Sequence, residues 1–150
     1  MWNPDQYQRF SEYRSRPFHD LIARIDAPQA KRIADLGCGP GNLTAALSQR
    51  WSESSVTGVD NSAEMLEKAK PMTRMWQLEF ELADLSTWQP KQAQHVIVSN
   101  AALQWVPNHE RLIPRLTSLL EPDGWLAVQM PNNFDQASHS SINQICSSSR

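Results

Sequence analysis

The segment IADLGCGPGN, residues 33–42, has the residue types best suited to holding a ligand, because Gly37, Gly39 and Gly41 are three of the chain's five glycines. A short apolar run precedes the glycines and a run of helical pattern follows them. Glycine accepts positive φ angles and lets the backbone approach a ligand closely. At a strand-to-helix junction, backbone N–H groups and the positive helix end can face a ligand. The spacing therefore predicts a ligand site built from bare backbone.

Asp60 stands about twenty residues after the glycines, at the end of the second apolar run SVTGVD. An acidic side chain there can accept two hydrogen bonds from a ribose diol. The glycine spacing is GxGxG, with Asn42 where a dinucleotide fingerprint has its third glycine. We therefore expect a nucleoside rather than a pyrophosphate at this site. The alternative is that the glycines form only a tight turn and that Asp60 only caps the next helix.

The glycines and Asp60 can meet only if secondary-structure elements bring them together. The chain alternates apolar runs of strand length with segments of helical period. This alternation is typical of an α/β fold with a parallel sheet built from βαβ units. Strands are expected at 32–36, 55–60, 78–82, 95–100 and 125–130, and helices at 43–50, 62–70 and 110–120. Two further helices, separated near Pro17, are expected before the first strand. Asn61, followed by Glu64, is expected to cap the helix at 62–70.

The composition argues against several classes of protein. A chain of 150 residues suits one domain with its own core, and a net charge of −2 gives no basic excess for nucleic acid or acidic lipid. No apolar run approaches ~18 residues and the first residues are polar, so we expect no membrane partner, no signal peptide and a cytoplasmic location. Cys38 and Cys146 form no CxxC pair and the histidines lack ligand spacing, so we expect reduced thiols and no metal.

The strings DLGCGPGN, GVDNS and ADLSTW resemble motifs of the class I S-adenosylmethionine-dependent methyltransferases. WNPDQYQRF, RSRP, NAALQW and LAVQMP resemble, more narrowly, the trans-aconitate methyltransferase family, from Trp2 to about Asn133. The resemblance implies a Rossmann-like, mainly parallel sheet of order 3-2-1-4-5-7-6. This chain ends soon after its fifth strand, so we expect the order 3-2-1-4-5 without strands 7 and 6, and helices on both faces. We expect a methyltransferase domain over 1–133 and a serine-rich, mobile tail over 134–150.

The resemblance also implies a set of residues that contact the cofactor S-adenosylmethionine. The set comprises Asp35, Gly37, Cys38, Gly39, Gly41, Asp60, Asn61, Met65, Asp84, Leu85 and Asn100. The glycine loop is expected to lie against the methionine part of the cofactor. Asp60 is expected to bind the ribose hydroxyls, and Asp35 to orient the loop or the ligand's ammonium group.

For the adenine ring, the resemblance implies contacts with Asp84, Leu85 and Met65. The Asp84 carboxylate is expected to accept the amino group, the Leu85 N–H to bond the ring, and Met65 to cover one face. Asn100 is expected near the methionine moiety, beside the transferred methyl group. The alternative for Asp84 is that it only starts a turn, and the alternative for Met65 is that it is an ordinary core residue.

The substrate side of the site is expected to involve Tyr7, Arg16 and Trp105. An arginine can hold a carboxylate with two parallel hydrogen bonds, although Arg16 also fits a solvated surface charge. Trp105 fits either a substrate contact or core packing. Cys38 has no base near it in the sequence, so we favour a small packing residue over a nucleophile.

The implied reaction is methyl transfer to a carboxylate of a small polycarboxylic acid such as trans-aconitate. A carboxylate is ionised at neutral pH and needs no general base, which agrees with the absence of an obvious catalytic dyad. Two alternatives stay open, a cofactor-binding fragment without turnover and an NAD-dependent oxidoreductase. If the strand at 125–130 is a sheet edge, we expect the chain to self-associate through it.

Overall fold

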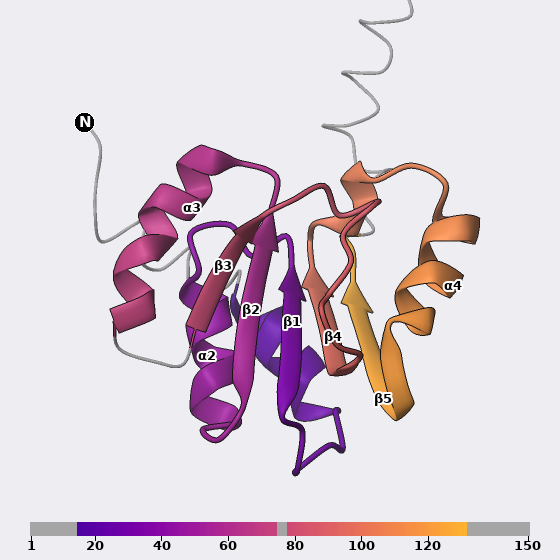
Figure 1. The fold of residues 1–150 in the computed structure, drawn as a ribbon, viewed down its shortest axis with the longest axis horizontal. Helices are drawn as coiled ribbons and strands as arrows, with labels where there is room; N and C mark the ends of the chain where they lie inside the picture. The colour runs from indigo at the N-terminus through magenta and orange to yellow at the C-terminus, as the bar shows by residue number, and fades with distance from the viewer. Residues whose placement is uncertain (1–14, 75–77, 132–150) are drawn as a thin grey trace, which may run out of the picture.

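The computed structural model describes residues 15–74 and 78–131 (Figure 1). A helix over residues 15–23 comes first. The other elements are β1 (Arg32–Leu36), α2 (Asn42–Arg50), β2 (Ser55–Asp60), α3 (Ala63–Ala69), the 3-10 helix η1 (Lys70–Arg74), β3 (Leu78–Leu82), β4 (Gln94–Asn100), the 3-10 helix η2 (Leu103–Trp105), α4 (His109–Ser118) and β5 (Leu120–Gln129). The expected boundary between a domain at 1–133 and a tail at 134–150 lies outside the described residues.

The five strands form one sheet in the order β3-β2-β1-β4-β5, and every neighbouring pair is parallel. The expected α/β fold and its strand order are confirmed. The register of β1 shows its central place, because Ile33 lies opposite Val56 of β2 on one side and Val96 of β4 on the other. Parallel strands end at the same edge of a sheet, so the residues that follow β1, β2 and β4 come together there.

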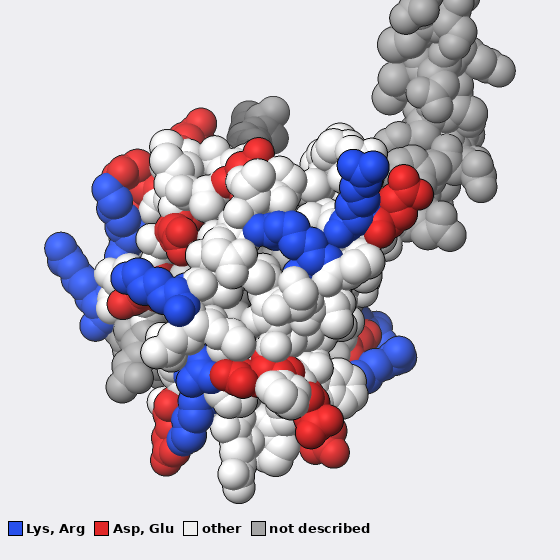
Figure 2. Space-filling model, turned by 45° about the vertical axis from the view of Figure 1, so that its right-hand side comes forward, with Lys and Arg blue, Asp and Glu red and all other residues white. Residues whose placement is uncertain are grey.

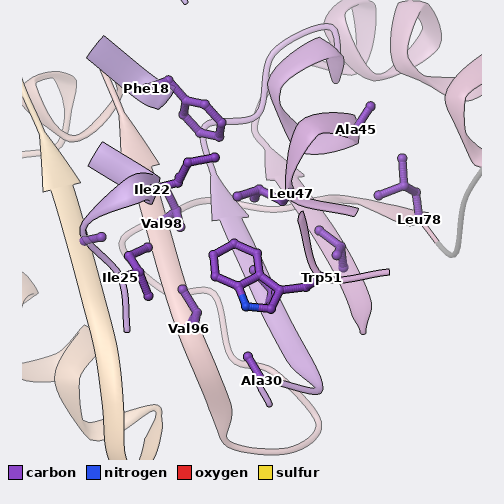
Figure 3. Close-up of a cluster of buried hydrophobic side chains, with 13 residues drawn as sticks. Phe18, Ile22, Ile25, Ala30, Ala45, Leu47, Trp51, Leu78, Val96 and Val98 are labelled. Atoms are coloured by element: carbon purple, nitrogen blue, oxygen red, sulfur yellow. The ribbon is translucent and has the colours of Figure 1, made fainter. Parts of the chain in front are cut away.

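Alternate residues of the strands build two separate cores, one on each face of the sheet. Ile33 and Val96 belong to the core beneath the helix of residues 15–23 and α2, which Figure 3 shows with Phe18 and Trp51. Ala34 and Ile97 belong to the other core, which includes Leu112, Leu116 and Leu119 at α4. This alternation follows from the two-residue period of a strand. Helices on both faces are therefore confirmed.

The sequence placed the last helix and strand less accurately than the first three strands. The helix was expected to end at residue 120 and the strand to begin at residue 125. In the structure α4 ends at Ser118 and β5 begins at Leu120. The segment EPDG lies inside β5, where the pairing with β4 shifts register and Asp123 has φ 63°. A bulge of this kind absorbs extra residues within a strand, so the turn residues there do not mark its start.

Two expectations about helix starts also changed. Ser62, not Asn61, caps α3, because the Ser62 hydroxyl accepts a hydrogen bond from the Met65 N–H at 3.3 Å. Pro17 lies within the helix of residues 15–23, and the helix expected before it falls outside the described residues.

The described residues have a surface of mixed charge and a sheet with two outer edges. Figure 2 shows Lys and Arg side chains interspersed with Asp and Glu on this face rather than gathered into a patch of one sign. The outer edges of the sheet belong to β3 and β5. No helix within 15–74 or 78–131 is long and apolar enough to cross a membrane.

Candidate ligand-binding site

A pocket of about 580 Å³ opens where the carboxyl ends of β1, β2 and β4 meet. The glycine loop after β1, the turn after β2 and the segment after β4 form most of it. Its lining residues come from these loops and from the turn after β3: Gly37, Gly39, Pro40, Asp60, Asn61, Met65, Asp84, Leu85, Ser86, Ala101, Ala102, Trp105, Val106 and Pro107. The pocket thus brings together eight residues of the expected site.

The glycine loop turns its N–H groups into the protein. The N–H groups of Gly37 and Cys38 donate to Val59 O, at 2.8 and 3.1 Å, and that of Gly41 donates to Cys38 O at 3.1 Å. Gly39 N–H donates to Asp60 Oδ2 at 2.8 Å. Pro40 has no N–H. The N–H groups of residues 37–41 are thus taken up by Val59 O and Asp60 at the end of β2 and by Cys38 O within the loop, so these N–H groups do not face the pocket as expected. A loop without free N–H donors is unsuited to a pyrophosphate and leaves bare backbone carbon facing the pocket.

Gly37 allows the loop to touch the segment after β4. Its φ is +79°, and a Cβ built on it would lie 2.1 Å from the Ala102 Cβ, far inside van der Waals contact. Gly39 also has positive φ, +54°, but a Cβ there would meet nothing within 4 Å. Gly37 is therefore required by packing, whereas Gly39 faces the open pocket.

Asp60 joins the glycine loop to the start of α3. One carboxylate oxygen accepts from Gly39 N–H at 2.8 Å, and the other accepts from Ser62 N–H at 2.9 Å. Asp60 therefore helps to organise the start of the next helix, as the alternative interpretation expected. A carboxylate has about four acceptor positions, so each oxygen keeps capacity for a further donor from the pocket side. Asp60 can shape the loop and bind a ligand at once.

Asp84 and its neighbours form the opposite wall of the pocket. One oxygen of Asp84 accepts from the backbone N–H and the hydroxyl of Ser86, both at 2.7 Å. These bonds hold the pKa of the Asp84 carboxyl below its usual value, the side-chain bond having the larger effect. Leu85 is buried behind the wall, and Met65 is half-buried and lines the pocket instead of joining either core. The wall therefore offers an ionised carboxylate beside apolar surface.

Trp105 stands at the rim with 81% of its surface exposed, so it is not a packing residue. An exposed indole beside a pocket is a ready contact surface for a flat or apolar ligand group. Arg16, by contrast, is exposed on the helix of residues 15–23, where its guanidinium lies 3.9 Å from Asp20, and it does not line the pocket. Its role in substrate binding stays a prediction. Tyr7 lies outside the described residues.

Asp35, on β1, and the Cys38 side chain, within the glycine loop, do not line the pocket. Asp35 is buried, and one of its oxygens accepts from the Thr44 hydroxyl of α2 at 2.7 Å. Burial raises the pKa of Asp35 from 3.8 to about 6, against the opposing effect of the Thr44 bond and with a smaller contribution from the charge of Asp60. Burial, followed by the charges of Asp35 and Asp60, also raises the pKa of the Cys38 thiol. A thiol kept protonated is a packing residue, which supports that interpretation of Cys38.

The raised pKa of Asp35 predicts a stability that falls with pH. A native carboxyl that titrates near 6, compared with 3.8 when unfolded, binds more protons in the native state. The free energy of unfolding should therefore fall between about pH 4 and 6 and level off above. Two pKa units correspond to at most about 3 kcal/mol. Urea unfolding across this pH range measures the free energy of unfolding of the wild type and of Asp35→Asn. The difference between these two free energies should change by about 2 kcal/mol.

Asp84→Asn is the matched control for this titration, because the pKa of Asp84 is lowered instead of raised. Stability from a lowered carboxyl pKa is present at neutral pH and lost as the pH falls. The free energy of unfolding of the wild type should therefore exceed that of Asp84→Asn by an amount that grows with pH. A pH profile of Asp35→Asn parallel to that of the wild type would contradict the assignment.

Pro40 and Ser86 line the pocket but were missed by sequence reasoning. Four more pocket residues, Ala101, Ala102, Val106 and Pro107, were missed as well. They follow β4 in the string AALQWVP, which has no glycine cluster or charged residue to mark it. Ala101 has φ 53°, an unusual conformation for a residue with a side chain. Gly41 and Asn100, which were expected in the site, lie next to it without lining the pocket.

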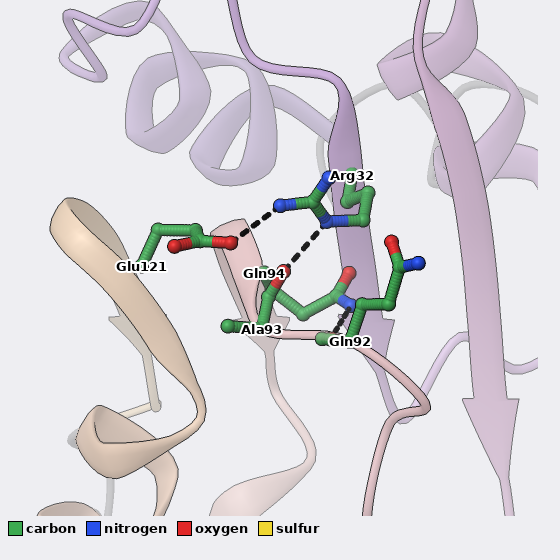
Figure 4. Close-up of polar contacts among 5 residues, drawn as sticks. All are labelled: Arg32, Gln92, Ala93, Gln94 and Glu121. Atoms are coloured by element: carbon green, nitrogen blue, oxygen red, sulfur yellow. Dashed lines mark hydrogen bonds and ion pairs between the residues drawn. The ribbon is translucent and has the colours of Figure 1, made fainter.

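A second cavity of about 510 Å³ lies near the opposite end of the sheet. Several of its polar groups are already bonded: Arg32 donates to Ala93 O at 2.7 Å and to Glu121 at 2.5 Å, and the Gln94 amide donates to Gln92 O (Figure 4). The Trp88 indole N–H likewise donates to a Glu81 oxygen at 3.0 Å. The cavity at the carboxyl ends of the strands is the better candidate, because it gathers eight residues of the expected site and this second cavity gathers none of them.

Comparisons with known proteins agree with this geometry. Residues 33–124 match the model of a family described as a methyltransferase domain. The chain is 50% identical, over 139 residues and 92% of its length, to a trans-aconitate 2-methyltransferase of Variovorax paradoxus, of which it covers 53%. It is 46% identical to the trans-aconitate 2-methyltransferase of Escherichia coli O139:H28, covering 56% of that protein. The chain thus spans little more than half the length of these relatives.

A solved structure also matches the fold. An S-adenosylmethionine-dependent methyltransferase from Mesorhizobium loti superimposes with a TM-score of 0.66 and 28% identity, over 75% of this chain and 52% of that one. The match indicates the same arrangement of sheet and helices over most of the described residues.

Proposed function

Because the chain belongs to the methyltransferase domain family, we propose that it binds S-adenosylmethionine in the pocket at the strand ends and methylates a carboxylate of a small polycarboxylic acid. The relatives named trans-aconitate 2-methyltransferase support trans-aconitate as this acid. The proposal rests on one observation. The carboxylates of Asp60 and Asp84 share a pocket with the glycine loop, whose own N–H groups, at residues 37–41, are all bonded within the protein.

The pocket residues fit a nucleoside whose outer groups are hydrogen-bond donors. Asp60 and Asp84 both line the pocket, and we expect Asp60 to accept from ribose hydroxyls and Asp84 from an exocyclic amino group. Leu85 and Met65 supply apolar surface between these carboxylates, which suits a base ring. A pyrophosphate would meet these two carboxylates and no free loop N–H, so an NAD-dependent oxidoreductase is not favoured.

When bound, S-adenosylmethionine supplies a methyl group on a positively charged sulfur, which a nucleophile displaces in one step. The described pocket lining contains no histidine, lysine or cysteine that could serve as a general base. A carboxylate nucleophile needs none, because it is already ionised at neutral pH. Repulsion from Asp60 and Asp84 should keep a polycarboxylate away from the nucleoside part of the pocket, which leaves the Trp105 side for the acceptor.

Thermal unfolding and a methyl-transfer assay test this proposal together. S-adenosylhomocysteine at 100 times its dissociation constant should raise the stability by about 2.7 kcal/mol, whereas NAD should not. The assay compares trans-aconitate with other di- and tricarboxylic acids. Stabilisation by NAD alone would contradict the proposal. Binding of S-adenosylhomocysteine without methyl transfer to any acid would support the alternative of a cofactor-binding fragment.

We also propose that the chain self-associates through the outer edge of β5. No strand in 15–74 or 78–131 pairs with this edge, and Trp125 on β5 is 37% exposed. An apolar strand edge with open backbone groups pairs readily with a second strand. Sedimentation over a range of concentrations should show association, and Trp125→Lys should weaken it. A monomer at every concentration would contradict this prediction.

A further inference from the structure

The segment between β4 and α4, residues 101–108, forms one side of the pocket and carries Trp105 at its rim. Figure 1 shows it beyond the end of β4, where the chain turns back into α4. Trp105 is 81% exposed, so packing does not fix its indole. The place of the indole is therefore set by the backbone of η2, and whatever holds that backbone also holds the indole.

This segment has an unusual backbone conformation at both of its ends. Ala101 has φ 53° and Asn108 has φ 59°, left-handed conformations that are costly for a residue with a side chain. Asn108 stands at the N-cap position of α4, but its side chain makes no cap bond there. Strained conformations persist where surrounding contacts hold them in place. The segment therefore depends on bonds with the elements around it.

His109, the first residue of α4, makes such a bond. Its ring nitrogen Nε2 lies 2.7 Å from Leu103 O in η2. Because a carbonyl oxygen can only accept, Nε2 carries a proton and donates it. The same oxygen accepts from the Val106 N–H at 3.0 Å, and the Leu103 side chain is fully buried. His109 thus ties the start of α4 to the turn that carries Trp105.

We propose that His109 is a positioning residue for the acceptor acid. By holding Leu103 O it keeps η2, and with it the Trp105 indole, in place beside the bound acid. This inference rests on the proposed function, which leaves the Trp105 side of the pocket for the acceptor. It adds a residue that does not itself line the pocket. The competing role is a structural one, in which the bond only stabilises the start of α4.

Steady-state methyl transfer by the 150-residue chain separates these two roles. With S-adenosylmethionine saturating, His109→Ala should raise the KM for trans-aconitate about fivefold, the size expected for one hydrogen bond, and should leave kcat unchanged. A structural defect would instead unfold part of the protein, which lowers kcat and leaves KM unchanged. The affinity for S-adenosylhomocysteine, measured by calorimetry, should stay at the wild-type value, because Asp60 and the glycine loop are untouched.

Matched variants isolate the bond. His109→Gln places an amide N–H near the position of Nε2, so its KM should stay within about twofold of the wild-type value. The amide of His109→Asn is too short to reach Leu103 O, so this variant should repeat the loss and replaces His109→Ala if that protein does not fold. Arg50→Met is the control, because it removes a similar bond from Arg50 to Ile25 O, at 2.8 Å, on the other face of the sheet. It should leave KM unchanged.

Hydrogen exchange gives a readout that does not depend on turnover. The Val106 N–H shares its acceptor with His109, so η2 should open more often in His109→Ala, and this amide should exchange about fivefold faster. His109→Gln should restore the wild-type exchange rate.

Four results in an active chain would overturn the inference and leave the proposed function in place. These are an unchanged KM in both His109→Ala and His109→Asn, a fall in kcat alone, a rise in KM as large in His109→Gln as in His109→Ala, and an equal rise in Arg50→Met. If the wild-type chain methylates no acid, the proposed function fails, and the inference fails with it whatever the exchange rates are.

Discussion

Replacing Gly37 with alanine is expected to lower the free energy of unfolding by about 4 kcal/mol and to abolish ligand binding. Two costs add up. A residue with a side chain pays about 1–2 kcal/mol for the left-handed conformation at φ +79°. The new Cβ would also lie 2.1 Å from the Ala102 Cβ, so the two loops must separate, at about 1–3 kcal/mol. Urea or thermal unfolding measures the loss directly.

Gly39→Ala is the matched control, because Gly39 has positive φ but open space around a built Cβ. It should cost only about 1–2 kcal/mol. A double variant tests the contact itself: Ala102→Gly removes the opposing methyl group and should restore part of the stability lost in Gly37→Ala. Equal losses at Gly37 and Gly39, with no rescue, would show that the contact with Ala102 is unimportant.

Replacing Asp60 with alanine is expected to weaken S-adenosylhomocysteine binding by about 4 kcal/mol, close to a thousandfold. Roughly half of this loss comes from ribose hydroxyls left without a charged acceptor. The remainder comes from the protein, because Gly39 N–H and Ser62 N–H lose their acceptors and no longer hold the loop in its binding conformation. Calorimetry gives the affinity of the folded variant.

Asp60→Asn separates these two contributions. An asparagine keeps one acceptor oxygen and removes the charge, so its affinity should fall between those of the wild type and Asp60→Ala. Hydrogen exchange at Gly39 should speed up in Asp60→Ala, because its N–H loses its partner. Wild-type affinity in a folded Asp60→Ala protein would remove Asp60 from the ligand site and leave it a purely structural role.

The first three strands were predictable because residues adjacent in the sequence mark where each of them ends. Glycines, polar residues and a helix cap follow short apolar runs, and the observed strands β1, β2 and β3 have the expected bounds. The start of β5 was not predictable in this way, since it depends on a register shift against β4. Such a shift is a property of two strands together, and turn residues such as Asp123 gave the opposite indication.

The candidate site was predictable as a set of residues but not as a set of bonds. Gly37 and Asp60 meet at one pocket, as motif spacing predicted, and Asp84 lines the same pocket, as the family resemblance implied. The direction of the loop N–H groups depends on Val59 O and on the Asp60 carboxylate, which belong to another strand. The exposure of Trp105 depends on what covers it, which no local pattern encodes.

The central place of β1 sets the order in which this site can form during folding. β1 pairs with β4, and the buried bond from the Ser99 hydroxyl to Leu36 O closes a separation of 63 residues. Contacts between distant residues carry a large entropic cost before they contribute stability, so such pairings form slowly. The loops after β1 and β4 that enclose the pocket therefore meet only late in folding. A ligand that bridges them should act mainly by slowing unfolding, with little effect on the rate at which the chain folds.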